Sequence, residues 1–122
     1  AGGSLAAGLQ YTGYDYYDEA GIDVSGVGDV DGDRLADFLV AARGSTYQGI
    51  QALVLGAASP TGGSLSTAIL YSGEAPSDGA ISADSAGDVN GDGLSDFVVG
   101  ASSNDDGGSV HFVSSAGDYT LT

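Results

Sequence analysis

Several residue types and patterns are missing from this sequence of 122 residues. There is no cysteine, so neither a disulfide nor a thiolate metal site can form. Basic residues are almost absent: Arg34 and Arg43 stand against seventeen acidic residues, and the net charge is −15. Because phosphate binding requires Lys and Arg to release counterions, nucleic acid is excluded as a partner. Anionic membrane surfaces are disfavoured for the same reason.

Long hydrophobic runs are missing too. No stretch approaches the roughly 18 apolar residues of a membrane span, so membrane insertion is not expected. There is no initiator Met and no signal peptide, and we expect either a mature form cleaved before Ala1 or a piece of a longer protein. The absence of an Asn-x-Ser/Thr sequon argues against N-glycosylation. The shortage of Lys and the wealth of Gly, Ser, Thr and Asp favour an extracellular or cell-surface location.

An acidic loop of nine residues occurs twice in the chain. Residues 29–37 read Asp-Val-Asp-Gly-Asp-Arg-Leu-Ala-Asp, and residues 88–96 read Asp-Val-Asn-Gly-Asp-Gly-Leu-Ser-Asp. A hydrophobic run follows each copy at once, at residues 38–42 and 97–101. Oxygen side chains at loop positions 1, 3, 5 and 9 can converge on one hard cation, and Ca²⁺ accepts that many flexible oxygens. The sequence therefore predicts a calcium-binding repeat protein.

The repeat extends beyond the loops. Shifting the sequence by 59 residues superimposes Ile22 on Ile81, and with one residue of slack residues 10–13 fall on 70–73. Each repeat reads as four short strands, because short apolar runs alternate with Gly, Ser, Pro and Asp. The expected strands are residues 22–27, 38–42, 50–55 and 68–72, then 81–86, 97–101, 109–113 and 119–122, with an orphan copy at 9–12. No segment keeps a helical period, so the fold class is all-β.

Four strands and one tight polar loop in about 60 residues fit the blade of a β-propeller. The shared pattern Gly-Asp-Val-(Asp/Asn)-Gly-Asp-x-x-x-Asp-Phe-(Leu/Val)-Val-(Ala/Gly)-Ala resembles the FG-GAP repeat of integrin α-chain propellers and of many bacterial surface proteins. The lead-in at residues 12–24 is similar to the bacterial version. The Phe-Gly pair that names the family is degraded at residues 20–21 and 79–80.

The resemblance implies two four-stranded antiparallel propeller-type blades with a calcium loop in each. Residues 1–13 would be the orphan outer strand of a preceding or neighbouring blade, residues 14–73 the first blade, and residues 74–122 the second. Propellers of the family have more than two blades, and two blades cannot close a ring. Partner chains, further sequence or a different packing must supply the remainder.

The family pattern also implies the ligands of two Ca²⁺ ions. They are the side chains of Asp29, Asp31, Asp33 and Asp37 with the Leu35 carbonyl, and those of Asp88, Asn90, Asp92 and Asp96 with the Leu94 carbonyl. The competing interpretation is an acidic turn without metal, since Asp and Asn are common in turns. Four inward-pointing oxygens, however, would repel one another strongly without a cation.

An EF-hand is rejected because it requires Glu at loop position 12, where Val40 and Val99 stand in expected strands. Position 6 favours glycine, which adopts a left-handed backbone at no steric cost. Gly93 meets this demand, whereas Arg34 in the first loop costs about 1 kcal/mol. We expect both sites to bind.

Catalysis finds no support in the sequence. His111, the only histidine, lies on an expected strand and is more often a surface or packing residue than a base. The acid pairs Asp18-Glu19 and Asp105-Asp106 fall in Gly-rich segments, which we interpret as solvated loops and not as a glycosidase pair.

The tyrosines near the orphan strand cover the top of the first blade or contact a subunit or glycan; they are Tyr11, Tyr14, Tyr16 and Tyr17.

Three functions remain open. The first is a non-catalytic, extracellular, calcium-binding structural repeat protein that assembles with other copies into a ring or fibre. Residues 9–12 would then pair with residues 109–113 of a neighbour by strand complementation. The second is a fragment of a cell-surface adhesin propeller that binds protein or glycan. The third, an accessory propeller segment of a hydrolase, has least support.

Overall fold

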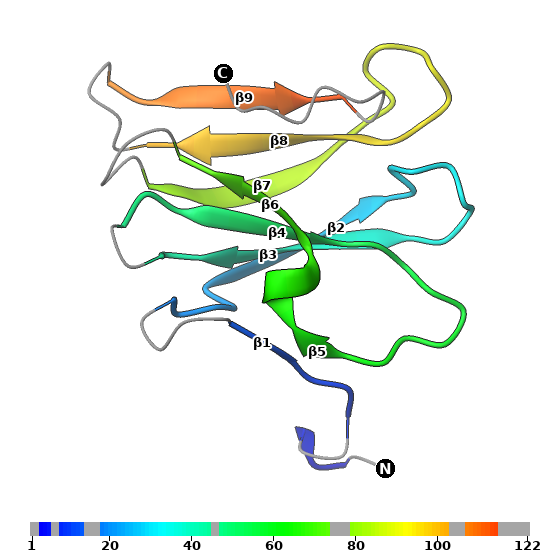
Figure 1. Ribbon diagram of the computed structural model, residues 1–122. Coiled ribbons are helices and arrows are strands. Elements are labelled where there is room, and N and C mark those ends of the chain that lie inside the picture. The colour runs from blue at the N-terminus through cyan, green and yellow to red at the C-terminus, as the bar shows by residue number, and fades with distance from the viewer. Residues whose placement is uncertain are drawn as a thin grey trace.

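The protein is built of strands, as the sequence predicts. The computed structural model describes residues 3–5, 8–13, 18–44, 47–73, 79–102 and 107–114, and among these it has no α-helix (Figure 1). None of the described segments is a helix long and apolar enough to cross a membrane. In chain order the elements are β1 (Tyr11–Thr12), β2 (Asp23–Gly28), β3 (Asp37–Ala42), β4 (Ile50–Val54), β5 (Gly63–Ser64), the 3₁₀ helix η2 (Leu65–Thr67), β6 (Ile69–Ser72), β7 (Ala80–Gly87), β8 (Asp96–Ala101) and β9 (Ser109–Val113).

The observed strands follow the expected ones closely. From β2 to β9, each strand that the sequence predicts begins and ends within one residue of its expected bounds, and β9 matches them. Alternation of apolar and small residues is a local signal, so it survives folding unchanged. The sequence did not predict β5 or η2, and the expected strand at residues 119–122 lies outside the described residues.

Two antiparallel sheets form the body of the molecule. The first has the order β2-β3-β4-β6 and the second the order β7-β8-β9, so each is a meander of sequential neighbours. The repeat relates β2 to β7, β3 to β8 and β4 to β9, at positions 59 residues apart. The two halves of the chain therefore build the same sheet twice.

The main core lies between the two sheets. Leu39 and Leu53 are cross-strand partners on the first sheet, and both side chains are buried against the second. Tyr71 from β6 packs edge-on against Phe97 from β8, with ring centroids 5.4 Å apart. Such aromatic pairs contribute about 0.5–1.5 kcal/mol beyond the area they bury. The other core side chains are Val27, Val30, Ala80, Val99, Ala101 and Val113.

The opposite face of the first sheet is also covered, by a layer we call the cover, made of β1, β5 and η2. Its Leu65 is buried against Val40 and Ala52, and its Tyr11 ring packs edge-on against Phe38 at a centroid distance of 5.5 Å. Figure 1 shows the cover and the second sheet on opposite sides of the first sheet. Burial on both faces explains why β3 and β4 read as almost continuous apolar runs.

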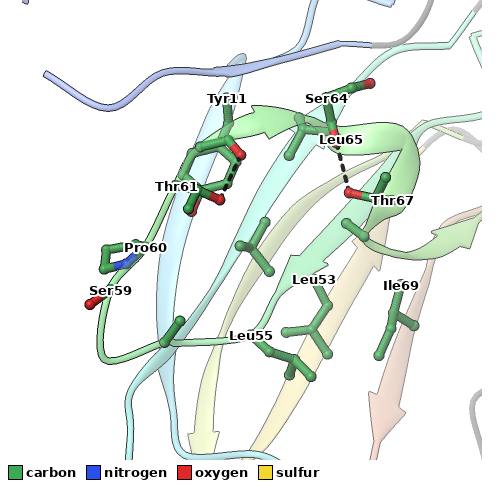
Figure 2. Close-up of a pocket in the computed structure, with 14 residues that line it drawn as sticks. Tyr11, Leu53, Leu55, Ser59, Pro60, Thr61, Ser64, Leu65, Thr67 and Ile69 are labelled. Atoms are coloured by element: carbon green, nitrogen blue, oxygen red, sulfur yellow. Dashed lines mark hydrogen bonds between the residues drawn. The ribbon is translucent and has the colours of Figure 1, made fainter.

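The cover is held lightly. Only two residue pairs join β1 to β5, and Gly63 N donates to Gln10 O at 2.9 Å. A cavity of about 290 Å³ remains between the loop that follows β4 and η2 (Figure 2). Its apolar lining includes Leu65 and Pro60. The cover thus fills this side of the first sheet incompletely.

The N-terminal strand differs from its expected arrangement. Residues 9–12 were expected to pair with residues 109–113 of another copy, but β1 is paired in parallel with β5 of the same chain. Only Tyr11 and Thr12 form the strand. Pairing between chains stays a prediction.

The interpretation of Asp18 as part of a solvated loop is wrong. Its side chain is buried, and Arg43 N donates to the Asp18 carbonyl at 2.7 Å, which ties this segment to the residue after β3. Gly21 N reinforces this with a bond to Ala41 O at 2.9 Å. Glu19 is exposed, as expected, and forms an ion pair with Arg43 at 3.0 Å.

Candidate metal centre

The two acidic loops occupy equivalent places in the fold. Residues 29–36 join β2 to β3, and residues 88–95 join β7 to β8. The loops touch each other: Ser95 N donates to the Asp29 carbonyl at 3.0 Å. Gly32 faces the Leu94 side chain so closely that a Cβ there would lie 3.1 Å from Leu94 Cδ2. The two candidate sites are therefore neighbours in space.

The first carboxylate of each loop organises the turn. Asp29 accepts the N–H of Gly32 on one oxygen at 2.6 Å and that of Arg34 on the other at 2.8 Å. Asp88 repeats the arrangement with the N–H groups of Gly91 and Gly93, both at 2.8 Å. Since both copies share this scheme, it follows from the loop sequence itself.

The last carboxylate anchors the loop in the sheet. Asp37 is buried; its Oδ2 accepts Val30 N and its Oδ1 accepts Gly56 N, each at 2.7 Å. Asp96 is buried as well and accepts Val89 N at 2.8 Å. Buried carboxylates held in this way are rigid oxygen donors.

The middle positions form short side-chain turns. Asp31 accepts Asp33 N at 3.0 Å, and Asp33 accepts Leu35 N at 2.8 Å.

The second loop keeps these bonds and adds others. Asn90 accepts Asp92 N at 3.0 Å, and Asp92 accepts Leu94 N at 2.9 Å. The Asn90 amide also donates to Asp92 Oδ2 at 3.1 Å and to Ser114 Oγ at 2.8 Å. The amide ties the second loop to the end of β9, a contact that the carboxylate of Asp31 cannot donate.

Three of the predicted acidic ligands converge in the first loop. Oxygens of Asp29, Asp31 and Asp37 all lie within 4.8 Å of one another. Calcium takes oxygens at about 2.3–2.6 Å, so oxygens around one ion lie up to about 5 Å apart. The donor set and its spacing therefore fit Ca²⁺. Asp33 lies outside this group, and the carbonyl role of Leu35 stays a prediction.

The second loop lacks such a trio. Among the described residues, the group in the first loop is the one set of three acidic side chains that meets this distance. Asn90 stands where Asp31 stands in the first loop, so one carboxylate is replaced by an amide oxygen. The ligand roles of Asp88, Asn90, Asp92, Leu94 and Asp96 stay predictions.

The electrostatics of the first loop favour a cation. The N–H of Asp33 lowers the pKa of Asp31, but loss of hydration and the carboxylates of Asp33, Asp37 and Asp29 outweigh it, so this pKa is raised. For Asp29, loss of hydration raises the pKa, yet the donated backbone bonds outweigh it and the pKa is lowered. Asp31 thus experiences the crowding of charge that a bound cation would relieve.

Loop position 6 has the predicted backbone in both copies. Arg34 lies at φ +72° and Gly93 at φ +88°, so the arginine is held in the left-handed region. At position 12, Val40 and Val99 are buried in β3 and β8, in agreement with rejection of an EF-hand.

Other sequence candidates are only partly described. His111 Nε2 lies 2.9 Å from Ser109 Oγ on β9. Tyr11 packs on Phe38 in the cover. Tyr14, Tyr16, Tyr17, Asp105 and Asp106 lie outside the described residues.

Two contacts to the loops had no signal in the sequence. Gly56 N reaches Asp37 from beyond β4, and Ser114 Oγ reaches Asn90 from beyond β9. Both partners are brought to the loop by strand pairing, so their distance along the chain conceals them.

Comparison with known proteins supports the repeat. The family model of the FG-GAP repeat matches residues 80–113, which run from β7 through the second acidic loop to β9. No curated protein matches the chain. The match confirms the FG-GAP resemblance, and within the chain it covers the second repeat.

Proposed function

We propose that this chain is a non-catalytic, extracellular structural protein made of two FG-GAP propeller blades, each of which binds Ca²⁺. The observation that carries the proposal is the convergence of Asp29, Asp31 and Asp37 within 4.8 Å, on a loop whose repeat in the same chain matches the FG-GAP repeat. FG-GAP repeats are typically extracellular and often bind calcium, which supports the location and the metal.

The blades are supported by the topology. Two antiparallel meanders have equivalent strands and stack face to face, as radial repetition requires. The non-catalytic role is carried over from the sequence, which offers a single histidine and no cysteine as candidate base or nucleophile.

Each residue in the loop has a distinct role in this proposal. Asp29 and Asp37 are rigid oxygen donors because backbone N–H groups fix both carboxylates. Asp31 is exposed and completes the trio. The ion, when bound, neutralises these carboxylates. Ser95 N donates to the Asp29 carbonyl, so the backbones of the two loops are joined beside the sites.

Assembly with other copies is the second part of the proposal. Two sheets cannot close a propeller ring, and β1 is attached by only two residue pairs. A strand held so weakly is suited to exchange between chains, where backbone bonds supply affinity. A ring or a fibre results, depending on whether the rotation between copies closes.

The metal is tested by calorimetric titration of calcium into chelator-treated protein. We expect two ions per chain, and a rise in melting temperature with calcium that reflects about 2.7 kcal/mol for each site at one hundred times its dissociation constant. Asp31→Ala should lower the stoichiometry to one. It should leave the melting temperature of the calcium-free protein unchanged or higher, because the crowded carboxylate is gone.

Asp23→Ala is the matched control, since Asp23 is an exposed acid on β2, outside both loops. It should keep two ions per chain. Failure of the wild-type protein to bind calcium at millimolar concentration would refute the proposal, as would equal effects of the two substitutions.

A further inference from the structure

The two sheets stack in one direction, so at each end of the stack one sheet face meets no other sheet among the described residues, and on the first sheet that face carries the cover. Phe38 and Val40 of the first sheet correspond to Phe97 and Val99 of the second. The first pair faces the cover, whereas the second pair faces the first sheet. The face of the second sheet that carries Phe97 and Val99 therefore packs on the face of the first sheet that carries Leu39 and Leu53. We call the latter face, and its equivalent on the second sheet, the reverse face.

None of the described residues covers the reverse face of the second sheet. Its residues correspond to buried residues of the first sheet: Val98 to Leu39, Val110 to Gln51 and Phe112 to Leu53. Val110 is 74% exposed and Phe112 is 47% exposed, while their counterparts are almost fully buried. A shallow hollow on this face is lined by Val98, Val110 and neighbouring residues of β7. We call this the open face.

The other end of the stack presents the complementary surface. Val24 on β2 corresponds to Ala83 on β7, which packs into the core between the sheets. Val24 itself is 66% exposed, beside the cover. The chain thus contains one complete interface and, at its two ends, the two separate halves of a second.

We propose that the open face of one copy docks on the Val24 side of the first sheet of a second copy, in the placement that the second sheet has on the first within the chain. This inference rests on the assembly part of the proposed function and names its surface. The occupant is a second copy because the repeat equivalents of these two surfaces already pack on each other within the chain.

The cover must move aside for this docking. It is suited to do so, because two residue pairs hold β1 to β5 and a cavity of about 290 Å³ lies beside η2 (Figure 2). Its departure also frees β1 for strand exchange. The contact is head-to-tail, since the two surfaces differ, and so it propagates from copy to copy.

A polar contact favours the same placement. Inside the chain, Ser25 Oγ donates to Asp84 Oδ1 at 3.2 Å between equivalent positions of β2 and β7. In the docked pair, Asp84 of the first copy takes the position that Ser25 has within the chain. Ser25 of the second copy takes the position of Asp84, so its hydroxyl can donate to the Asp84 carboxylate of the first copy.

The test uses three lysine substitutions with the same change in charge, followed by sedimentation velocity in millimolar calcium. Val110→Lys alters the open face and Val24→Lys the opposite surface. Tyr47→Lys is the control, because Tyr47 is 59% exposed and lies outside both. Each substitution makes the net charge less negative, so a loss of assembly cannot arise from greater repulsion.

We expect the wild type and Tyr47→Lys to form species larger than a monomer. Val110→Lys and Val24→Lys should each raise the concentration needed for assembly by about tenfold or more, because a charge would be buried without a partner. Mixed together, these two variants should form a one-to-one dimer and nothing larger, since each retains the surface that the other has lost. That dimer would also show that both variants are folded.

Three outcomes would overturn the inference. One is assembly that Val24→Lys leaves intact while Val110→Lys abolishes it, which would indicate two open faces back to back. Another is a mixture that stays monomeric. The third is a wild type that is monomeric at every concentration while it still binds calcium, which would remove assembly and leave the metal site standing.

Discussion

The two halves of this chain share one repeat but differ in how much of it is buried. Leu53 and Phe112 hold the same place in the repeat, yet Leu53 is buried and Phe112 is about half exposed. Within the part of the chain that the structure describes, the first sheet has a layer on both faces, whereas the second has a layer on one. Burial in a repeat protein is therefore set by position in the stack, not by the repeat itself.

In the acidic loops, by contrast, the structure is set by the repeat and not by position in the stack. Their surroundings differ, since Asp37 receives a bond from Gly56 and Asn90 donates one to Ser114. The bonds within each loop nevertheless follow the same scheme, from the first carboxylate to the last. A loop closed by its own side chains is determined locally.

The largest expected effect separates two equivalent glycines, Gly49 and Gly108. Both lie at positive φ, +80° and +98°. A Cβ on Gly49 would lie 2.6 Å from the carbonyl carbon of Ala80, where the two halves meet, whereas the nearest atom to a Cβ on Gly108 is 3.5 Å away. Gly49→Ala should cost at least about 3 kcal/mol, beyond the roughly 1–2 kcal/mol of backbone strain expected for Gly108→Ala. Urea denaturation measures both, and equal losses would contradict the difference between the halves.

A smaller effect distinguishes the anchored end of the first loop from its exposed middle. Asp37→Ala leaves the N–H groups of Val30 and Gly56 without their acceptor, which should cost about 2–4 kcal/mol even without calcium. Asp33→Ala, the matched control, removes an exposed acceptor of one N–H and should cost less than about 1 kcal/mol. Urea denaturation in chelator compares them, and a similar cost for both would show that Asp37 is not an anchor.

The smallest expected effect comes from exchanging the residues at loop position 6. Arg34→Gly should relieve the strained backbone and stabilise the protein by up to about 1 kcal/mol. Gly93→Arg, whose Cβ meets open space, should destabilise it by about the same amount. Calcium affinity should change about fivefold in the same directions. Thermal unfolding and calcium titration of both variants check this, and changes of equal sign would contradict it.

Much of the fold could be predicted because its signals are local. The apolar run in residues 50–55 predicts β4, and the glycines and aspartates of the loops mark the turns between strands. The cover could not be predicted: Gly63 and Ser64 carry no strand signal and pair with β1 only because the chain returns to it. The burial of Asp18 was missed for the same reason, since its segment is bonded to Arg43, 25 residues away in the chain.

The sequence by itself determined the all-β class, the strand bounds and the placing of the loop oxygens, because each depends on spacing along a few residues of backbone. Only the tertiary structure decided which faces are covered and where β1 pairs. Burial and strand pairing require groups distant in the chain to meet, and a repeat of identical pattern cannot say which copy meets which. Leu53 and Phe112 show this most clearly. They hold the same place in the repeat, but Leu53 is buried between the sheets and Phe112 is about half exposed to water.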